Sequence, residues 1–382
     1  MSNNTVLVIF GGRSVEHEIS IITACQAINN FDKKKYNIVP VYIDKNNTWL
    51  TGKPLTNIDS FKKKEISKLG GIYKCKLLPV VFDNKYFLEV KFPFYVKKIE
   101  FDIAFPIIHG TNGEDGTIQG MFEFMNIPYV GCGVLSSAVG MDKVAQKIIF
   151  EKEKINIIPF KYFWIYDWEN NKKMILDRVE KLKYPFCVKP SNLGSSVGIS
   201  IAKNRRELIY AIEVASKFDR KIIVEKALID MKEINCSVTG FESTVLVSVC
   251  EQPIKTEKIL SYEDKYIKGR KTKGSKNFSK LIPAPISESL RKQVQEWAKK
   301  AFTSLGGSGV SRIDFMYDNK TKKLFLNEIN TIPGSLSFYL WEKSGLSYTK
   351  LLDKLVNWGL KKHKIKNDIL FTYESNVFNK DY

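Results

Sequence analysis

Apolar runs and turn residues alternate in the first third of the chain in the order strand, turn, helix. Residues 5–10 (TVLVIF) have the continuous apolar pattern of a buried strand and end at a glycine pair. Ser14 then precedes an apolar-periodic run, which predicts a helix capped by that serine. Residues 36–43 and 101–108 predict two further strands, and residues 117–125 predict a helix. The alternation indicates an α/β domain, in which ligands gather at the carboxyl ends of the strands.

The middle of the chain repeats this alternation. Residues 184–189 (YPFCVK) and 199–202 predict two strands joined by a loop rich in glycine and serine. A helix over residues 205–217 and a strand over residues 221–225 follow. In contrast, residues 45–100 mix apolar stretches with lysine clusters and predict no defined role.

A clear amphipathic helix begins at Ser287 and ends at Gly306. One stripe of apolar residues along it predicts a core face: Leu290, Val294, Trp297, Ala298, Ala301, Phe302 and Leu305. Residues 311–330 then predict two strands around a polar turn. A final helix is predicted over residues 348–358, and the tail from residue 367 onwards has no pattern that indicates a purpose.

Length and composition limit the class of protein. A chain of 382 residues with 44% hydrophobic and 12% aromatic residues has enough apolar surface for two or three folded domains. No apolar run is long enough to span a membrane, and the N-terminus predicts a first strand rather than a signal peptide. The six cysteines are scattered without zinc-ligand spacing, which favours free thiols in a reducing cytoplasm.

The net charge of +19 raises the question of nucleic-acid binding. However, the lysines are spread along the chain, and no RNA-binding or zinc-finger motif is present. We therefore interpret the charge as a lysine-rich surface, with a smaller positive field around an anionic substrate, and expect no nucleic acid as a partner.

The predicted hairpin carries the strongest candidate chemistry. Strand alternation places Arg312 and Asp314 on one face of its first strand, and Glu328 and Asn330 on one face of its second. Two carboxylates and an amide with open coordination positions suit Mg²⁺, which takes oxygen ligands and substrate phosphates. The alternative is a solvated edge hairpin with ordinary surface charges.

Two glycine-rich loops are candidates for substrate contacts. Residues 190–198 (PSNLGSSVG) follow Lys189, and successive backbone N–H groups in such loops bind anions. The loop joins two strands and lacks the Walker pattern, so it predicts a flap over phosphates rather than a P-loop. Residues 109–116 (HGTNGEDG) form the second loop, where His109 suggests a function beyond a turn. Plain loops remain the alternative for both.

Two basic features complete the candidates. Lys143 lies in the first turn of a helix that Asp142 can cap, where a cation opposes the helix dipole unless an anion is near. The alternative is an exposed lysine. Residues 262–280 are rich in lysine and glycine, and they predict either a lid over phosphates or a disordered surface loop.

Taken together and in order, these pieces resemble the D-alanine–D-alanine ligases of the ATP-grasp superfamily. The matching motifs are GGRSVEHEIS, HGTNGEDGTIQG, PYVGCGVLSSAVGMDK, VKPSNLGSSVGIS, EDKY, and SRIDF with NEINTIPG, spread over residues 11–334. The resemblance implies a three-domain α/β ATP-grasp fold. Its parts would be a Rossmann-like parallel-sheet domain (1–132), a central subdomain (133–223), a C-terminal subdomain (224–365) and a tail (366–382).

The resemblance also implies the roles of individual residues. Asp314, Glu328 and Asn330 would hold two Mg²⁺ ions, with Mn²⁺ as an alternative metal. ATP would be bound by Lys143, Lys189, Ser195, Ser196, Glu225, Lys226, Glu233, Lys265 and Asn327. The amino-acid substrates would contact Glu16, His109, Arg312, Gly334, Ser335 and Leu336. Glu16, Ser195 and Tyr266 would be linked when the lid closes, and Arg312 would stabilise the oxyanion of the tetrahedral intermediate.

The implied reaction joins two D-alanines through an acylphosphate formed from ATP, in peptidoglycan precursor synthesis. The family further implies a cytoplasmic homodimer with small-molecule substrates. One departure concerns the segment after Gly334, which is several residues shorter than is usual where the family binds its second substrate. D-Serine and D-lactate therefore stay open as alternative second substrates, with D-alanine favoured by the Lys265–Tyr266 pair.

Overall fold

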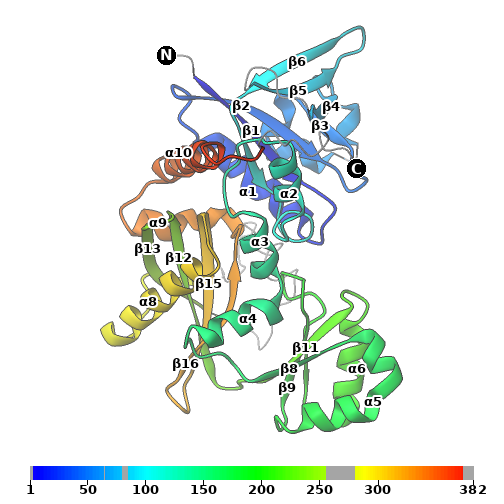
Figure 1. The fold of residues 1–382 in the computed structure, drawn as a ribbon, viewed down its shortest axis with the longest axis vertical. Helices are drawn as coiled ribbons and strands as arrows, with labels where there is room; N and C mark the ends of the chain where they lie inside the picture. The colour runs from blue at the N-terminus through cyan, green and yellow to red at the C-terminus, as the bar shows by residue number, and fades with distance from the viewer. Residues whose placement is uncertain (1–2, 64, 80–84, 255–279, 373–382) are drawn as a thin grey trace, which may run out of the picture.

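Three β-sheets, each with its own helices, make up the part of the chain that the structure describes (Figure 1). The computed structural model describes residues 3–63, 65–79, 85–254 and 280–372. In this part of the chain, no helix combines the length and apolar character that crossing a bilayer requires. The predicted lid, including Lys265 and Tyr266, lies outside the described residues.

The N-terminal sheet is a mixed sheet of seven strands in the order β6-β5-β4-β3-β2-β1-β7. Three strands at one end of the sheet are parallel, as predicted: β1 (Asn4–Gly11) pairs with β2 (Tyr36–Ile43) and β7 (Ile103–Ile107). The other strands are antiparallel and extend one edge: β3 (Trp49–Thr51), β4 (Tyr73–Leu77), β5 (Tyr86–Lys91) and β6 (Val96–Phe101). The sheet is therefore parallel only in part. Short 3₁₀ turns lie between β3 and β4: η1 (Lys53–Thr56), η2 (Ile58–Lys62) and η3 (Ile66–Lys68).

Two helices of this domain follow its parallel strands. α1 (His17–Asn30) follows β1, and α2 (Thr117–Phe124) follows the loop after β7. The prediction that Ser14 caps α1 is wrong, because Glu16 occupies the cap position and makes no side-chain cap bond. The Ser14 hydroxyl instead accepts a hydrogen bond from the Glu16 N–H at 3.1 Å, which holds Glu16 at the start of α1.

The second sheet has four antiparallel strands in the order β10-β9-β11-β8. They are β8 (Phe160–Trp164), β9 (Phe186–Pro190), β10 (Ser200–Ala202) and β11 (Lys221–Lys226). α5 (Ile165–Glu180) and α6 (Arg205–Ala215) cover one face, where Phe163, Val188 and Ile222 are buried. The other face carries Lys189 and Glu225, since side chains alternate along each strand. α3 (Val134–Met141) and α4 (Lys143–Lys152) lie between this sheet and the N-terminal domain (Figure 1).

The third sheet has the order β14-β13-β12-β15-β16 and contains the predicted hairpin. Its strands are β12 (Met231–Phe241), β13 (Thr244–Pro253), β14 (Lys280–Leu281), β15 (Gly309–Asp318) and β16 (Leu324–Asn330). α8 (Glu288–Ser304) covers one face, and Ser287 caps it as predicted by accepting from the Leu290 N–H. The predicted apolar stripe of α8 is confirmed, because all of its residues belong to or pack against the core beneath this sheet.

The chain then returns to the first domain. η4 (Gly334–Ser337) and α9 (Phe338–Lys343) lead into α10 (Tyr348–Asn367), which is longer than the predicted helix over residues 348–358. Leu351 and Leu355 of α10 are buried in the same core as Val6 and Phe105 of the N-terminal sheet. The first and last elements of the described chain therefore share one core.

Candidate active site

The β15–β16 hairpin brings its polar residues together on one face. The strands pair with Arg312 opposite Asn330 and Asp314 opposite Glu328. Arg312 donates two hydrogen bonds to the Asp314 carboxylate, from Nε at 2.6 Å and from Nη2 at 2.7 Å. Asn330 Nδ2 donates to Asp314 Oδ2 at 3.1 Å. Because Asp314 is only 5% exposed, the alternative of a solvated surface hairpin is excluded.

Burial dominates the electrostatics of this face. It raises the pKa of Asp314 to about 6, although the Arg312 guanidinium opposes the shift. The negative charge of Glu328 raises that pKa further. A divalent cation nearby would favour the ionised form of the Asp314 carboxyl and would therefore oppose the effect of burial. The donor set of two carboxylates and an amide therefore fits a hard cation such as Mg²⁺.

Two lysines from different elements face the hairpin. Lys143 is buried at the start of α4, where the Asp142 side chain caps the helix as predicted. Its Nζ lies 3.2 Å from Glu328 Oε2 and donates to the Leu193 carbonyl at 2.8 Å. The alternative of an exposed lysine is therefore wrong, and a carboxylate lies beside Lys143, whereas its contact with phosphate stays a prediction.

Lys189 extends from β9 toward the second strand of the hairpin. Its Nζ is 2.5 Å from Glu225 Oε2 and 3.2 Å from Asn327 Oδ1. Glu225 also contacts Lys147, which sequence reasoning missed. Lys147 follows Lys143 by four residues on α4 and so lies on the same helix face, a spacing that could have revealed it.

The glycine- and serine-rich loop folds over the N-terminal domain. Ser195 and Ser196 both have positive φ, at 54° and 60°, which turns the chain sharply. The Ser195 hydroxyl donates a hydrogen bond to Glu16 Oε1. A Cβ at Gly194 would lie 2.6 Å from Glu16 Oε2, so a side chain there would force the Glu16 carboxylate to shift. The loop therefore connects Glu16 to the face of the second sheet that carries Lys189.

Behind Glu16 lies a buried polar cluster. His109 Nδ1 is 3.5 Å from Glu114 Oε1, and His109 Nε2 is 2.9 Å from Thr23 Oγ1. Thr23 Oγ1 in turn accepts a hydrogen bond from the Ser335 N–H at 3.0 Å. Burial lowers the pKa of His109 and raises the pKa of Glu16. Sequence reasoning missed Thr23 and Glu114, and only the glycine-rich loop around Glu114 gave a signal.

Glu114 provides a test of this cluster through the pH dependence of stability. Burial raises the pKa of its carboxyl from 4.5 to about 8, so the folded protein binds this proton more tightly than the unfolded chain does. The resulting stabilisation is complete below pH 4.5 and disappears as the pH rises through about 8. We expect Glu114→Gln to remove this loss of stability, which amounts to roughly 4 kcal/mol.

Denaturant unfolding of wild type and Glu114→Gln between pH 5 and pH 8.5 measures the effect. The difference in unfolding free energy between the two proteins should move in favour of the variant as the pH rises. A difference that is independent of pH would contradict the burial of an ionisable carboxyl at this position. Glu213→Gln, an exposed site on α6, is the matched control.

The short segment after Gly334 has an unusual backbone. Ser335, Leu336 and Ser337 have positive φ values of 53°, 49° and 51° in succession. The Leu336 side chain is 1% exposed and packs in the core shared by α1 and α10. Leu336 can therefore offer a substrate only its backbone, whereas Ser335 is partly exposed.

Two other predicted ATP ligands lie near the edges of this arrangement. Lys226 Nζ donates to the carbonyls of Lys183 and Tyr184, at 2.8 and 2.6 Å, and so closes the strand end of β11. Glu233 lies on β12 opposite Met316, and its charge raises the pKa of Asp314. Neither contact tests their predicted binding of ATP.

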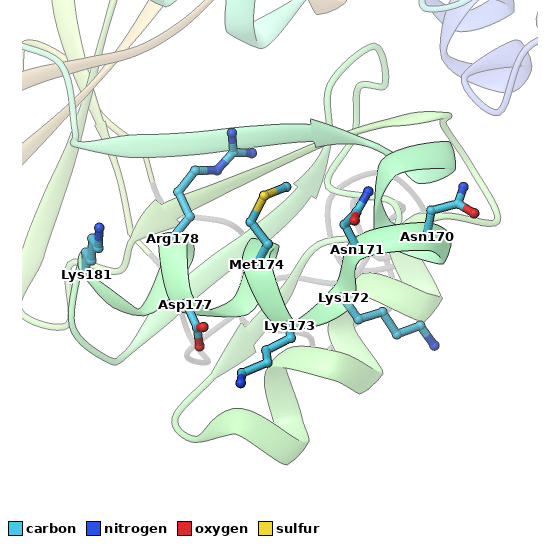
Figure 2. Close-up of a pocket in the computed structure, with 8 residues that line it drawn as sticks. All are labelled: Asn170, Asn171, Lys172, Lys173, Met174, Asp177, Arg178 and Lys181. Carbon is cyan, nitrogen blue, oxygen red and sulfur yellow. The ribbon is translucent and has the colours of Figure 1, made fainter.

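A separate surface hollow of about 700 Å³ lies along α5 (Figure 2). It is lined by Asn170, Asn171, Lys172, Lys173, Met174, Asp177, Arg178 and Lys181. None of these residues was predicted to bind a substrate or a metal. The hollow is therefore distinct from the site on the hairpin.

Comparison with known proteins relates this chain to one family. The family model "D-ala D-ala ligase N-terminus" matches residues 5–132, and "D-ala D-ala ligase C-terminus" matches residues 149–357. A D-alanine–D-alanine ligase of Thermosipho melanesiensis is 41% identical over 364 residues, covering 94% of each chain.

Solved structures agree with this relationship. The D-alanine–D-alanine ligase of Coxiella burnetii aligns with a TM-score of 0.78 at 29% identity, covering 96% of this chain and 97% of that one. The VanG D-Ala:D-Ser ligase of Enterococcus faecalis aligns with a TM-score of 0.78 at 30% identity, covering 94% and 100%. The expected ATP-grasp fold is confirmed. The chain belongs to the D-alanine–D-alanine ligase family.

Proposed function

We propose that this protein is an ATP-dependent ligase that joins two D-alanines into D-alanyl-D-alanine for peptidoglycan precursor synthesis. The observation that carries the proposal is the continuity of the site. The Ser195 hydroxyl links Glu16, the proposed amino-acid end, to the loop whose Leu193 carbonyl contacts Lys143. Lys143 in turn contacts Glu328, at the proposed phosphate end.

The first step activates D-alanine. Glu16 pairs with the ammonium group of the first D-alanine, and His109 lies near its carboxylate. Lys143 and Lys189 bind the α- and β-phosphates of ATP, and the loop at Ser195 and Ser196 covers the γ-phosphate. A carboxylate oxygen of the first D-alanine attacks the γ-phosphorus of ATP. The bond between this phosphorus and ADP breaks, and the acylphosphate of D-alanine forms. Catalysis of this step rests on positioning and charge neutralisation.

The metal site is part of this proposal. Asp314, Glu328 and Asn330 would hold two Mg²⁺ ions, or Mn²⁺ in their place, together with phosphate oxygens. Bound there, the ions would neutralise charge on the phosphates. Glu225, Lys226, Glu233 and Asn327 are proposed to complete the nucleotide site around adenine and ribose, with Lys265 contributing from the lid.

The second step forms the peptide bond. The amine of the second D-alanine attacks the acyl carbon, loses a proton, and phosphate leaves. Arg312 and the N–H near Gly334 stabilise the oxyanion of the tetrahedral intermediate. Closure of the lid, with Tyr266 linked to Ser195 and Glu16, keeps water away from the acylphosphate.

A specific observation supports a second candidate for the nucleophile. The segment after Gly334 is short, and its Leu336 side chain is buried in the core. A solved relative of similar fold, VanG, is named a D-Ala:D-Ser ligase. D-Serine, and by the same reasoning D-lactate, therefore stand as alternative second substrates.

Phosphate release tests both candidates in one experiment. With ATP and Mg²⁺, we expect rapid phosphate release with D-alanine alone and a single dipeptide product by mass spectrometry. Mixtures of D-alanine with D-serine or D-lactate measure preference for the nucleophile. Turnover that requires D-serine or D-lactate would identify that compound, and not D-alanine, as the second substrate. An absence of turnover with all three compounds would contradict the proposed reaction.

We also propose the domain limits 1–132, 133–223 and 224–365, followed by a tail. The three separate sheets support three units, but β11 of the second sheet continues to Lys226, so this sheet extends past the limit at residue 223. Use of ATP and the six free cysteines support a cytoplasmic enzyme. The homodimer stays a prediction, which sedimentation of the purified chain can test.

A further inference from the structure

Three charged side chains form a buried triad behind the proposed phosphate site. Lys147 Nζ lies 2.8 Å from Glu225 Oε1, and Lys189 Nζ lies 2.5 Å from Glu225 Oε2. The side chains of Lys147 and Glu225 are 1% exposed, and that of Lys189 is 5% exposed. The buried triad thus consists of one carboxylate between two ammonium groups, carried by α4, β9 and β11.

The charge state of the triad follows from these contacts. Burial alone would raise the pKa of Glu225, but the ammonium groups of Lys147 and Lys189 outweigh it and lower the pKa to about 2. Burial lowers the pKa of Lys147, and the Glu225 carboxylate opposes that effect. With both lysines protonated and Glu225 ionised, the triad has a net charge of about +1.

Lys147 is a costly residue to place at this position. Removing an ammonium group from water costs several kcal/mol, which a single carboxylate partner only partly offsets. An apolar residue of similar length would fill the same space on α4 without that cost. Packing therefore does not account for the lysine, whereas its effect on Glu225 does.

The effect of Lys147 on Glu225 determines how much positive charge Lys189 can offer to an anion. With Lys147 present, Glu225 divides one negative charge between two cations, so Lys189 keeps much of its attraction for an anion. Without Lys147, Glu225 would form a one-to-one pair with Lys189 and cancel its charge. The Lys147 ammonium group is directed to Glu225, at 2.8 Å, so its effect on a bound anion is assigned to this pair.

We propose that Lys147 is a positioning residue that sets the affinity for nucleotide by balancing Glu225 and thereby leaving Lys189 available to phosphate. The inference rests on the proposed function, which places the phosphates of ATP beside Lys189. It also assigns the Glu225 carboxylate to the two lysines, so that any contact of residue 225 with adenine is made by its backbone.

Calorimetric titration of the full chain with MgADP tests this inference without turnover. Lys147→Met should weaken binding about 10- to 100-fold, the cost of neutralising one phosphate-binding cation. Lys147→Arg keeps the charge and should retain most of the affinity. Lys152→Met, at an exposed lysine on the same helix, is the matched control and should bind like wild type.

The double variant Lys147→Met/Glu225→Gln decides between charge balance and structure. It removes one cation and one anion, so Lys189 keeps its charge and binding should return to within about threefold of wild type. A merely structural role for Lys147 predicts that the double variant binds as weakly as Lys147→Met or more weakly. That result, or unchanged binding by Lys147→Met, would overturn the inference.

Two further measurements keep the outcomes separate. If Lys147→Met does not fold, the double variant alone decides, because a loss of about tenfold or more in its affinity contradicts charge balance. Lys189→Met tests the proposed function itself. If wild type does not bind MgADP, or if Lys189→Met binds it as tightly as wild type, the proposed phosphate site is wrong irrespective of Lys147.

Discussion

Replacing Glu328 by glutamine is expected to lower kcat by about 100-fold or more while leaving the fold intact. Glu328 lies opposite Asp314 on the hairpin, and its Oε2 is 3.2 Å from Lys143 Nζ. Glutamine keeps the size of the side chain but removes the negative charge that a divalent cation and Lys143 both require. The loss should be accompanied by a higher Mg²⁺ concentration for half-maximal activity.

Phosphate release at saturating ATP and D-alanine, titrated with Mg²⁺, measures this effect. Thermal unfolding of the same preparation shows whether the fold is kept. Glu296→Gln, at an exposed position of α8, serves as the control and should behave like wild type. Near-normal kcat in Glu328→Gln with an unchanged Mg²⁺ requirement would refute the metal site on the hairpin.

The second large effect is expected at Arg312. Its guanidinium binds Asp314 through two parallel hydrogen bonds, a geometry that a lysine cannot reproduce. Arg312→Lys should therefore lower kcat by roughly 100- to 1,000-fold, the usual cost of losing a preorganised donor to an oxyanion. The KM for ATP should change much less, because the proposed role of Arg312 begins after nucleotide has bound.

Steady-state kinetics with ATP and D-alanine varied in turn separates these two parameters. Arg291→Lys is the matched control, since Arg291 pairs with Glu288 on the exposed side of α8. A rise in the KM for ATP with little change in kcat would instead assign Arg312 to nucleotide binding. Unfolding curves should show that the pair with Asp314 is not needed for folding.

Local patterns predicted much of the fold because they depend on neighbours in sequence. β2 has the bounds that its apolar run predicts, and α8 is capped by Ser287 and ends before Gly306 as expected. The hairpin was predicted because alternation along two short strands fixes which side chains share a face. Its pairing of Asp314 with Glu328 then follows from the antiparallel register.

Contacts between distant segments could not be predicted in the same way. Within residues 45–100, β4 alternates exposed lysines with half-buried residues, β5 alternates buried with half-buried ones, and their antiparallel pairing shows only in the sheet. The spacing of Lys147 from Lys143 places both on one face of α4, but only the contact of Lys147 with Glu225 on β11 shows that it is buried. The part that Thr23 plays in the site is likewise seen only in the structure, where its hydroxyl accepts a hydrogen bond from the Ser335 N–H.

The prediction of the site residues depended on the resemblance to a known family more than on local sequence patterns. Spacing alone left Lys143 and the glycine-rich loops open between functional and ordinary interpretations. The structure resolves Lys143 through its contact with Glu328, and it places Ser195 on Glu16. The lid residues Lys265 and Tyr266 lie outside the described residues, so their roles stay predictions.

The return of α10 to the first sheet has a consequence for synthesis on the ribosome. Leu351, Leu352 and Leu355 fill part of the core beneath the N-terminal strands, although they are made more than two hundred residues after β7. A nascent chain that has emerged only as far as residue 132 therefore exposes an apolar face that its own sequence cannot cover. Until the last helix is translated, this half-finished domain is a natural client for chaperones.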